Sequence, residues 1–264
     1  MERELIIVRG GGDIATGVIQ KLYRAGLPLL VLETERPMAI RRTVSLCEAV
    51  IHGFARVEDV SAKRVADEAE MWACLQAGLV PMAVDPAGDW IARLSPGCVV
   101  DAILAKRNIG THMSMAPVVI GLGPGFAAGQ DVHAVVETMR GHDLGRLILY
   151  GSAQPNTGIP GELGGKSAER VLHAPCDGVV RHVKAIGDVA SKGEVLFYVG
   201  ETPCLAPFTG LLRGLIAEMP VKRGMKVADI DPRTDVAWNT ISDKARCIGG
   251  SVLEAYLYLR KGRR

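Results

Sequence analysis

Residues 5–15 read Leu-Ile-Ile-Val-Arg-Gly-Gly-Gly-Asp-Ile-Ala and decide how the first half of the chain folds. Four apolar residues that run into glycines predict a buried strand of a parallel sheet. The next apolar residues recur at helical spacing and stop before Gly26: Ile14, Val18, Ile19 and Leu22. Residues 29–32 then form a second apolar run. This order predicts a strand, a helix and a second strand, which together open a parallel α/β sheet.

The same alternation continues through residue 150. Further strands are expected at 80–84, 99–104, 118–122 and 147–150. Two further helices are expected from their inward-facing residues, which are Val65, Ala69, Trp72 and Leu75 for one, and Val132, Val135, Val136 and Met139 for the other. Strands that alternate with helices predict a Rossmann-like α/β domain over residues 1–165, with a doubly wound, mostly parallel sheet. A C-terminal helix within 236–264 is expected to start at an N-cap, Ser242, and to pack back on this domain.

Residues 171–233 contain an internal repeat. One half begins Ala174-Pro175-Cys176-Asp177-Gly178-Val179-Val180-Arg181, and the other begins Ala206-Pro207-Phe208-Thr209-Gly210-Leu211-Leu212-Arg213. Each half continues to a basic residue followed by glycine, at 192–193 and at 223–224. A repeat of about thirty residues with these turns predicts two intertwined β-hairpin units.

The repeat resembles the biotinyl/lipoyl-like barrel-sandwich hybrid, an all-β module expected here over residues 166–235. Such modules usually carry a modified lysine on the tight turn between their halves. The corresponding stretch of this chain, 198–204, reads Tyr-Val-Gly-Glu-Thr-Pro-Cys and contains no lysine. The resemblance therefore implies the scaffold of a carrier module without its attachment point, and we expect neither biotin nor a lipoyl group.

Composition narrows the class of protein. The formal charge of +2 over 264 residues gives no support for binding to nucleic acid or to an anionic membrane. No apolar run reaches the roughly 18 residues of a membrane-spanning helix, and residues 1–4 show no signal-peptide layout. The six cysteines are scattered without a Cys-x-x-Cys pair, which is typical of a reduced cytoplasmic protein and indicates no metal site.

The first glycine loop has the pattern of a dinucleotide-binding fingerprint. Gly10 and Gly12 lie between the expected strand and helix, and Glu33 follows about twenty residues later at the end of the next strand. Such a loop binds phosphate through its amides, while the acid binds a ribose hydroxyl. The carboxylate of Asp13 can instead occupy the anion site at the helix start. Two interpretations stay open: a site for a nucleotide or pterin phosphate, and a tight turn capped by its own aspartate.

A second glycine loop, Gly121-Leu122-Gly123-Pro124-Gly125, follows another expected strand. The amides of Gly123 and Gly125 can hold a phosphate or carboxylate. Asp131 comes next, and after it the cluster Arg140-Gly141-His142-Asp143-Leu144-Gly145-Arg146. Arg140, His142 and Arg146 suit an anionic ligand, and a polar surface turn is the alternative. Because the preceding segment is expected to be a helix that runs back along the sheet, this cluster would have to fold over to reach the loop, or the contact would have to come from a partner subunit.

Residues 41–48, Arg-Arg-Thr-Val-Ser-Leu-Cys-Glu, contain a candidate thiol. Ser45 and Glu48 form a capping-box pattern, so a helix is expected to start at residue 46. Cys47 would then lie in the first turn, where helix amides and the neighbouring Arg41 and Arg42 lower the pKa of a thiol. Cys47 is thus the candidate catalytic residue, for sulfur or selenium chemistry, with Arg41 and Arg42 as anion-binding candidates. A small buried cysteine is the other interpretation.

Several of these stretches together resemble the YqeB family, whose members are accessory factors of selenium-dependent molybdenum hydroxylase systems. The stretches are residues 9–17, 41–45, 121–131, 137–146, 155–161, 229–233 and 241–244. The resemblance implies a maturation role for such an enzyme, with a molybdenum hydroxylase as client partner. It implies as ligand molybdopterin, the molybdenum cofactor, or a nucleotide. It supplies no catalytic residues.

Two other functions are compatible with the same residues. One is an independent nucleotide-dependent oxidoreductase or transferase, and the other is a non-catalytic scaffold. The sequence leaves open whether any reaction is catalysed and whether the chain forms a homo-oligomer.

Overall fold

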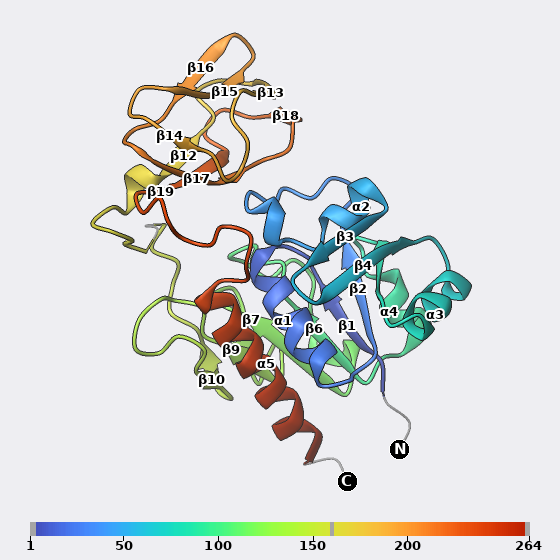
Figure 1. Cartoon of the computed structure of the whole chain (residues 1–264). Helices are drawn as coiled ribbons and strands as arrows, with labels where there is room; N and C mark the ends of the chain where they lie inside the picture. Colours follow the sequence, from blue (N-terminus) through green and yellow to red (C-terminus); the bar gives the residue numbers. More distant parts are fainter. Residues whose placement is uncertain (1–3, 159–160, 262–264) are drawn as a thin grey trace. The chain divides into compact units, whose positions relative to one another are not determined.

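The computed structural model describes residues 4–158 and 161–261 (Figure 1). The chain divides into two compact units. Unit 1 comprises residues 1–37, 45–156 and 241–264, and unit 2 comprises residues 38–44 and 157–240. The boundaries fall at 156/157 and 240/241, where 165/166 and 235/236 were expected, and the short segment 38–44 joins unit 2. The C-terminal helix belongs to unit 1.

Unit 1 is built on one mixed sheet of nine strands in the order β10-β9-β7-β6-β1-β2-β5-β4-β3. Seven of these strands run parallel, and the two edge strands β3 and β10 run antiparallel to their neighbours. In that order the strands are Leu147–Ile148, Ala134–Val136, Val118–Leu122, Cys98–Asp101, Ile6–Arg9, Leu29–Glu33, Val80–Val84, Val60–Val65 and Phe54–Val57. The strands β8 (Ala127–Ala128) and β11 (Gly151–Ser152) form a separate two-stranded sheet.

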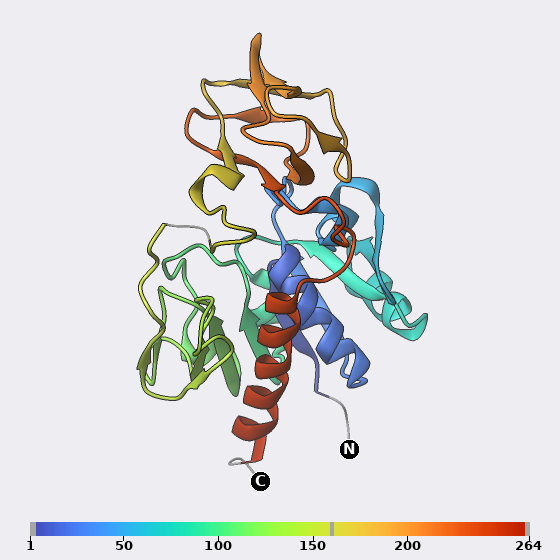
Figure 2. The same cartoon turned by 60° about the vertical axis from the view of Figure 1, so that its left-hand side comes forward.

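Helices pack on both faces of this sheet (Figures 1 and 2). They are α1 (Asp13–Arg24), α2 (Glu48–His52), α3 (Glu68–Gln76), α4 (Asp89–Leu94) and α5 (Asp243–Lys261). The helices α3 and α4 share a buried apolar cluster with the central strands, to which Met71 and Trp90 contribute. On the other face α1 and α5 lie side by side (Figure 2). The expected N-cap of α5 is confirmed, because the amide of Ala245 donates to Ser242 Oγ at 3.2 Å.

Two local expectations for unit 1 are wrong. Residues 132–139 do not form a helix, because Ala134–Val136 is the strand β9, parallel to β7. Its three consecutive apolar residues are all buried, as in a strand covered on both faces. The helix α3 starts at Glu68, behind an Asp67 N-cap, and turns Met71 and Cys74 inward, while Trp72 is 48% exposed. Val65 instead ends β4, part of an antiparallel hairpin with β3.

Unit 2 contains two four-stranded antiparallel sheets, β12-β19-β17-β14 and β16-β15-β13-β18. The strands β12–β19 in chain order are Val171–His173, Gly178–His182, Val189–Ala190, Val195–Val199, Thr202–Leu205, Gly210–Leu215, Pro220–Val221 and Lys226–Asp231. The repeated stretches supply one inner strand to each sheet, β13 and β17. Apolar side chains such as those of Phe197, Leu212 and Ile230 form the buried core of this unit.

The expectation of a barrel-sandwich module is wrong. Within residues 161–240 the two sheets remain separate, and no barrel closes. Closure requires hydrogen bonds between edge strands of the two sheets. The edge strands β14 and β18 have only two residues each, so they offer little backbone for such pairing. The fold is a mixed α/β unit with a large, mostly parallel sheet, and a second unit of two open sheets.

Candidate functional site

The strand order of unit 1 places a topological switch point between β1 and β6. From β1 the chain continues to β2 on one side, and it returns later to β6 on the other side. In open α/β sheets, ligands bind outside the carboxyl ends of the strands at such a point. The loops that meet there are residues 10–12 after β1, 102–111 after β6 and 123–126 after β7. We call the region formed by these loops and the first turns of α1 and α5 the carboxyl-edge site.

The loop after β1 joins that strand to α1, as its glycines predict. Gly10 has φ +94°, and a Cβ on it would lie 3.0 Å from the carbonyl oxygen of Ala102, so the first two loops pack backbone to backbone. Gly12 is the N-cap of α1, and no atom lies within 4 Å of the place where its Cβ would be. The helix start is therefore open at Gly12.

Two carboxylates already engage amides of this loop. Glu33 Oε1 accepts a hydrogen bond from the Gly11 amide at 2.9 Å, and its Oε2 accepts from the Thr34 amide at 2.6 Å. Asp13 Oδ1 accepts from the Ile14 amide at 2.8 Å. Glu33 thus stabilises the glycine loop itself, and Asp13 uses part of the anion-binding capacity of the α1 N-terminus.

The loop after β7 is held closely by its neighbours. A Cβ on Gly125, which has φ +110°, would lie 2.6 Å from Arg107 Cα in the adjacent loop. The Gly123 amide donates to the carbonyl of Val136 at 2.9 Å. Asp131 Oδ2 accepts from the Ala127 amide at 2.9 Å and so closes the turn that follows. The loop leads into β8 and not into a helix, so only its own amides are available to an anion.

The loop after β6 is the one that the sequence did not indicate. Leu104 and Lys106 both have left-handed backbone conformations, with φ +60° and +65°. Such conformations are strained for residues other than glycine, and they persist where the surroundings determine them. Two strained residues within three positions, between two glycine loops, mark this loop as specialised.

A buried polar network fixes both ends of that loop. Thr111 Oγ1 donates to Asp101 Oδ2 at 2.6 Å and accepts from Arg9 Nη1 at 2.6 Å. Arg9 Nη1 also lies 3.7 Å from Asp101 Oδ2, and all three residues are buried. Asn108 Oδ1 accepts from the amides of residues 110 and 111. Charges buried in this way are stable only when paired and hydrogen-bonded, so the network is a rigid base for the loop.

Lys244, in the first turn of α5, is a further residue that the sequence did not single out as a ligand group. Its pKa is lowered, first by burial and then by the neighbouring cations Lys106 and Arg140, while Asp13 and Glu137 act in the opposite direction. These interactions place Lys244 among groups from three other parts of the carboxyl edge. The only signal in the sequence was its place in the stretch 241–244, which contributed to the family resemblance.

Arg140 also lies at this edge. Its guanidinium makes two hydrogen bonds to the carboxylate of Asp243, at 2.7 and 2.9 Å. The segment 140–146 does not have to fold over to reach this edge, because β9 runs parallel to β7 and ends at the same edge. Arg146 pairs instead with Asp143 at 3.3 Å, and it is exposed. His142 lies in the exposed turn between them.

Cys47 does not have the activated thiol that we expected. It precedes α2 as its N-cap and is fully buried, and its amide donates to the carbonyl of Gly11 at 2.9 Å. Burial raises the pKa of this thiol, and the carboxylates of Glu33, Glu48 and Asp13 raise it further. The prediction of a lowered pKa is therefore wrong, because desolvation outweighs the helix start.

Arg41 and Arg42 belong to unit 2. There the Arg41 guanidinium donates to the carbonyl of Thr240 at 3.5 Å, and the neighbouring Ile40 carbonyl accepts from the Leu215 amide at 2.8 Å. Segment 38–44 thus adds backbone pairing along β17.

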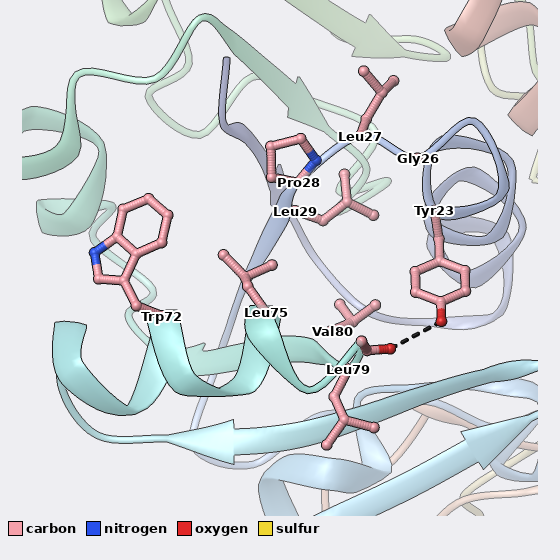
Figure 3. A pocket seen from close by; sticks show the side chains of 10 residues that line it. Tyr23, Gly26, Leu27, Pro28, Leu29, Trp72, Leu75, Leu79 and Val80 are labelled. Carbon is pink, nitrogen blue, oxygen red and sulfur yellow. Dashed lines mark hydrogen bonds between the residues drawn. The ribbon is translucent and has the colours of Figure 1, made fainter. Parts of the chain in front are cut away.

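One pocket of about 390 Å³ lies elsewhere in unit 1 (Figure 3). Its walls are mostly apolar, with the aromatic side chains of Tyr23 and Trp72 on opposite sides. The Tyr23 hydroxyl donates to the carbonyl of Gly78 at 2.9 Å. The pocket includes Leu29 and Val80, the first residues of β2 and β5, so it lies at the amino ends of these strands. The glycine loops and the cationic groups lie at the opposite edge.

Two kinds of feature are absent from the described residues. Among them, no group of three or more histidine, cysteine, aspartate or glutamate side chains is arranged to hold a metal ion. None of the helices in the described part of the chain is both long enough and apolar enough to cross a membrane.

The fold and its carboxyl edge define an α/β protein of the open-sheet class, with an appended unit of two β-sheets. Comparison with known proteins gives one relative by sequence, "Uncharacterized protein YqeB" of Escherichia coli (strain K12). It is 48% identical over 258 residues, an alignment that covers 97% of this chain and 48% of that protein. The chain thus spans about half the length of the curated relative it matches. This similarity supports the resemblance to the YqeB family, and the relative's name states no activity. No protein-family profile matches the chain.

The solved structures compared here are distant in sequence. An aspartoacylase family protein of Mesorhizobium loti is 10% identical, with 87% of this chain and 85% of that chain covered and a TM-score of 0.29. A succinylglutamate desuccinylase of Silicibacter sp. TM1040 is 12% identical, with coverage of 86% and 84% and a TM-score of 0.26. Scores this low carry no argument about the chemistry of this chain.

Proposed function

We propose that this chain is an accessory protein that binds a phosphate-bearing anionic cofactor at the carboxyl-edge site. The observation that carries the proposal is the convergence of three tightly packed loops and two helix starts at the switch point of the sheet. Helix N-termini and glycine-loop amides favour anions, and the cations Lys106, Arg140 and Lys244 add to that preference. The family resemblance supports a molybdopterin-type cofactor and a molybdenum hydroxylase as the client that receives it.

A dinucleotide is a weaker candidate on the same geometry. In dinucleotide-binding folds, the acid at the end of the second strand binds a ribose hydroxyl. Here both oxygens of the Glu33 carboxylate already accept hydrogen bonds, from the backbone amides of Gly11 and Thr34. The loop after β7 also lacks a helix start. A pterin phosphate needs neither feature.

Mass spectrometry of small molecules released from the purified protein tests this proposal. We expect a phosphate-bearing pterin in the denatured supernatant of protein made in cells that synthesise the molybdenum cofactor. Release of NAD(P) would instead support an independent oxidoreductase. An empty protein that binds neither class of compound, yet binds a hydroxylase, would contradict cofactor binding and support a scaffold.

Gly12→Val is the matched variant, because a Cβ there meets open space and the fold should persist. It should release less of the same compound if the cofactor approaches the start of α1. Equal amounts released from both proteins would remove this loop from the site.

A further inference from the structure

The helices α1 and α3 end in the same way. Both are followed by Ala-Gly-Leu, at residues 25–27 and 77–79. The two glycines have left-handed backbones, with φ +71° at Gly26 and +72° at Gly78. The amide of each glycine donates to the carbonyl three residues before it, at 2.8 and 3.0 Å, and the amide of each leucine donates to the carbonyl five residues before it, at 3.2 and 3.0 Å. Both helices therefore finish in the same glycine-based cap, and each leads directly into a strand, β2 or β5.

The apolar pocket lies where these two helix ends meet. Residues 26–29 after α1 and residues 78–80 after α3 line it (Figure 3). The strands that follow, β2 and β5, are paired neighbours in the sheet, and the Tyr23 hydroxyl ties one helix end to the other through the carbonyl of Gly78 at 2.9 Å. A cavity of about 390 Å³ is large enough for a small molecule. Its shape is thus held by caps, strand pairing and a hydrogen bond.

Two aromatic side chains stand on opposite sides of this cavity, Tyr23 from α1 and Trp72 from α3 (Figure 3). The helix α3 turns Met71 and Cys74 into the core, while Trp72 is 48% exposed, so its indole ring is available to a ligand. The faces of aromatic rings carry partial negative charge and attract cations, and tryptophan attracts them most strongly. The rings therefore favour a positively charged ligand.

The helix ends favour a cation too, because the C-terminus of a helix is the negative end of its dipole. The last turn of α3 contains no basic residue. In the last turn of α1, Arg24 makes two hydrogen bonds of 2.8 Å to the carboxylate of Asp59, and the stem of Lys21 packs against α5 near Gly249. The negative dipole ends at the pocket are thus not neutralised by a lysine or arginine pointing into it.

The lining also restricts the kind of cation. Among the residues that the structure describes, the ten that line the pocket include no charged side chain. A strongly hydrated ion would lose its water shell here without gaining a carboxylate partner, which is costly. A cation covered by methyl groups is weakly hydrated, buries apolar surface against the leucines, and still interacts with the rings and the dipoles.

We propose that this pocket binds a small organic cation of the quaternary ammonium class, with the methylated head between the rings of Tyr23 and Trp72. The site lies at the opposite edge of the sheet from the carboxyl-edge site, and it does not depend on the proposed cofactor.

An NMR titration of the nitrogen-labelled full chain with choline tests the proposal. The chain has three tryptophans, and the indole N–H signal of Trp72 is identified by its absence from Trp72→Leu. Choline should shift this signal and leave those of Trp90 and Trp238 in place. The comparison compound is the uncharged carbon analogue, in which a tert-butyl group replaces the trimethylammonium group. It has the same shape, so we expect it to bind roughly tenfold more weakly, because it lacks the charge that the rings and dipoles attract.

Calorimetry compares the variants. Trp72→Leu should weaken choline binding roughly tenfold, since it removes one ring of the pair. Tyr150→Leu is the matched control, because Tyr150 is a fully separate exposed aromatic residue beside the edge strand β10. Its affinity should equal that of the wild type, and urea unfolding checks that both variants are folded. The proposal is overturned if choline leaves the Trp72 signal unchanged, if the uncharged analogue binds as tightly as choline, or if the two leucine variants bind choline equally well.

Discussion

The contact between α1 and α5 makes a sharp prediction about Gly249. A Cβ on this residue would overlap the carbonyl oxygen of Gly17 and lie 2.9 Å from Lys21 Cγ. The Gly17 atom is backbone and cannot rotate away, so Gly249→Ala must push the helices apart. Overpacking of this kind costs about 2–3 kcal/mol, and the better helix propensity of alanine returns about 1 kcal/mol. We expect the free energy of unfolding to fall by about 1–2 kcal/mol.

Gly250→Ala is the matched control in the next position of the same helix. No atom lies within 4 Å of its Cβ position, and the residue is exposed. Its free energy of unfolding should therefore rise by up to about 1 kcal/mol. Urea unfolding followed by circular dichroism measures both variants. Equal stabilisation by the two alanines would refute the close helix contact.

Three other predictions follow from single residues. Gly12→Val should leave urea unfolding unchanged but lower the affinity for the released cofactor about tenfold or more; unchanged affinity would exclude the loop. Cys247 is exposed whereas burial raises the pKa of Cys47, so iodoacetamide near neutral pH should label Cys247 first, and fast labelling of Cys47 in folded protein would contradict its environment. Hydrogen bonds from Arg24 lower the pKa of Asp59 from 3.8 to about 2. Its stabilising effect should be complete above about pH 4 and be lost as the pH falls through about 2. The stability difference between wild type and Asp59→Asn should therefore shrink in acid, and a constant difference would count against the Arg24 pairing.

The strand and helix that open the chain could be predicted because their signals are local. Residues 6–8 of the strand are apolar. The helix that follows has one apolar face, and the helix ends shortly before Gly26. The segment 132–139 could not be assigned in this way. Its buried β-branched residues fit a helix face as well as a strand, and only the pairing of β9 with β7 decides between them.

The candidate site was predictable only in part. Glycine spacing located the loops after β1 and β7, because segments whose backbones pack closely together need glycine, and glycines are visible in the sequence. Lys244 could not be found in this way, since its surroundings come from segments far apart in the sequence, among them Asp13 and Lys106. Cys47 shows the opposite error. Its sequence neighbours suggested an activated thiol, while burial, which depends on the whole fold, sets its pKa.

The most direct test of ligand binding at the carboxyl edge is a crystal structure of the purified full chain grown or soaked with its released cofactor. We predict density for a phosphate group at the carboxyl edge, close to the start of α1 at Gly12. A ligand bound instead in the apolar pocket of Tyr23 and Trp72, with the carboxyl edge empty, would contradict the account.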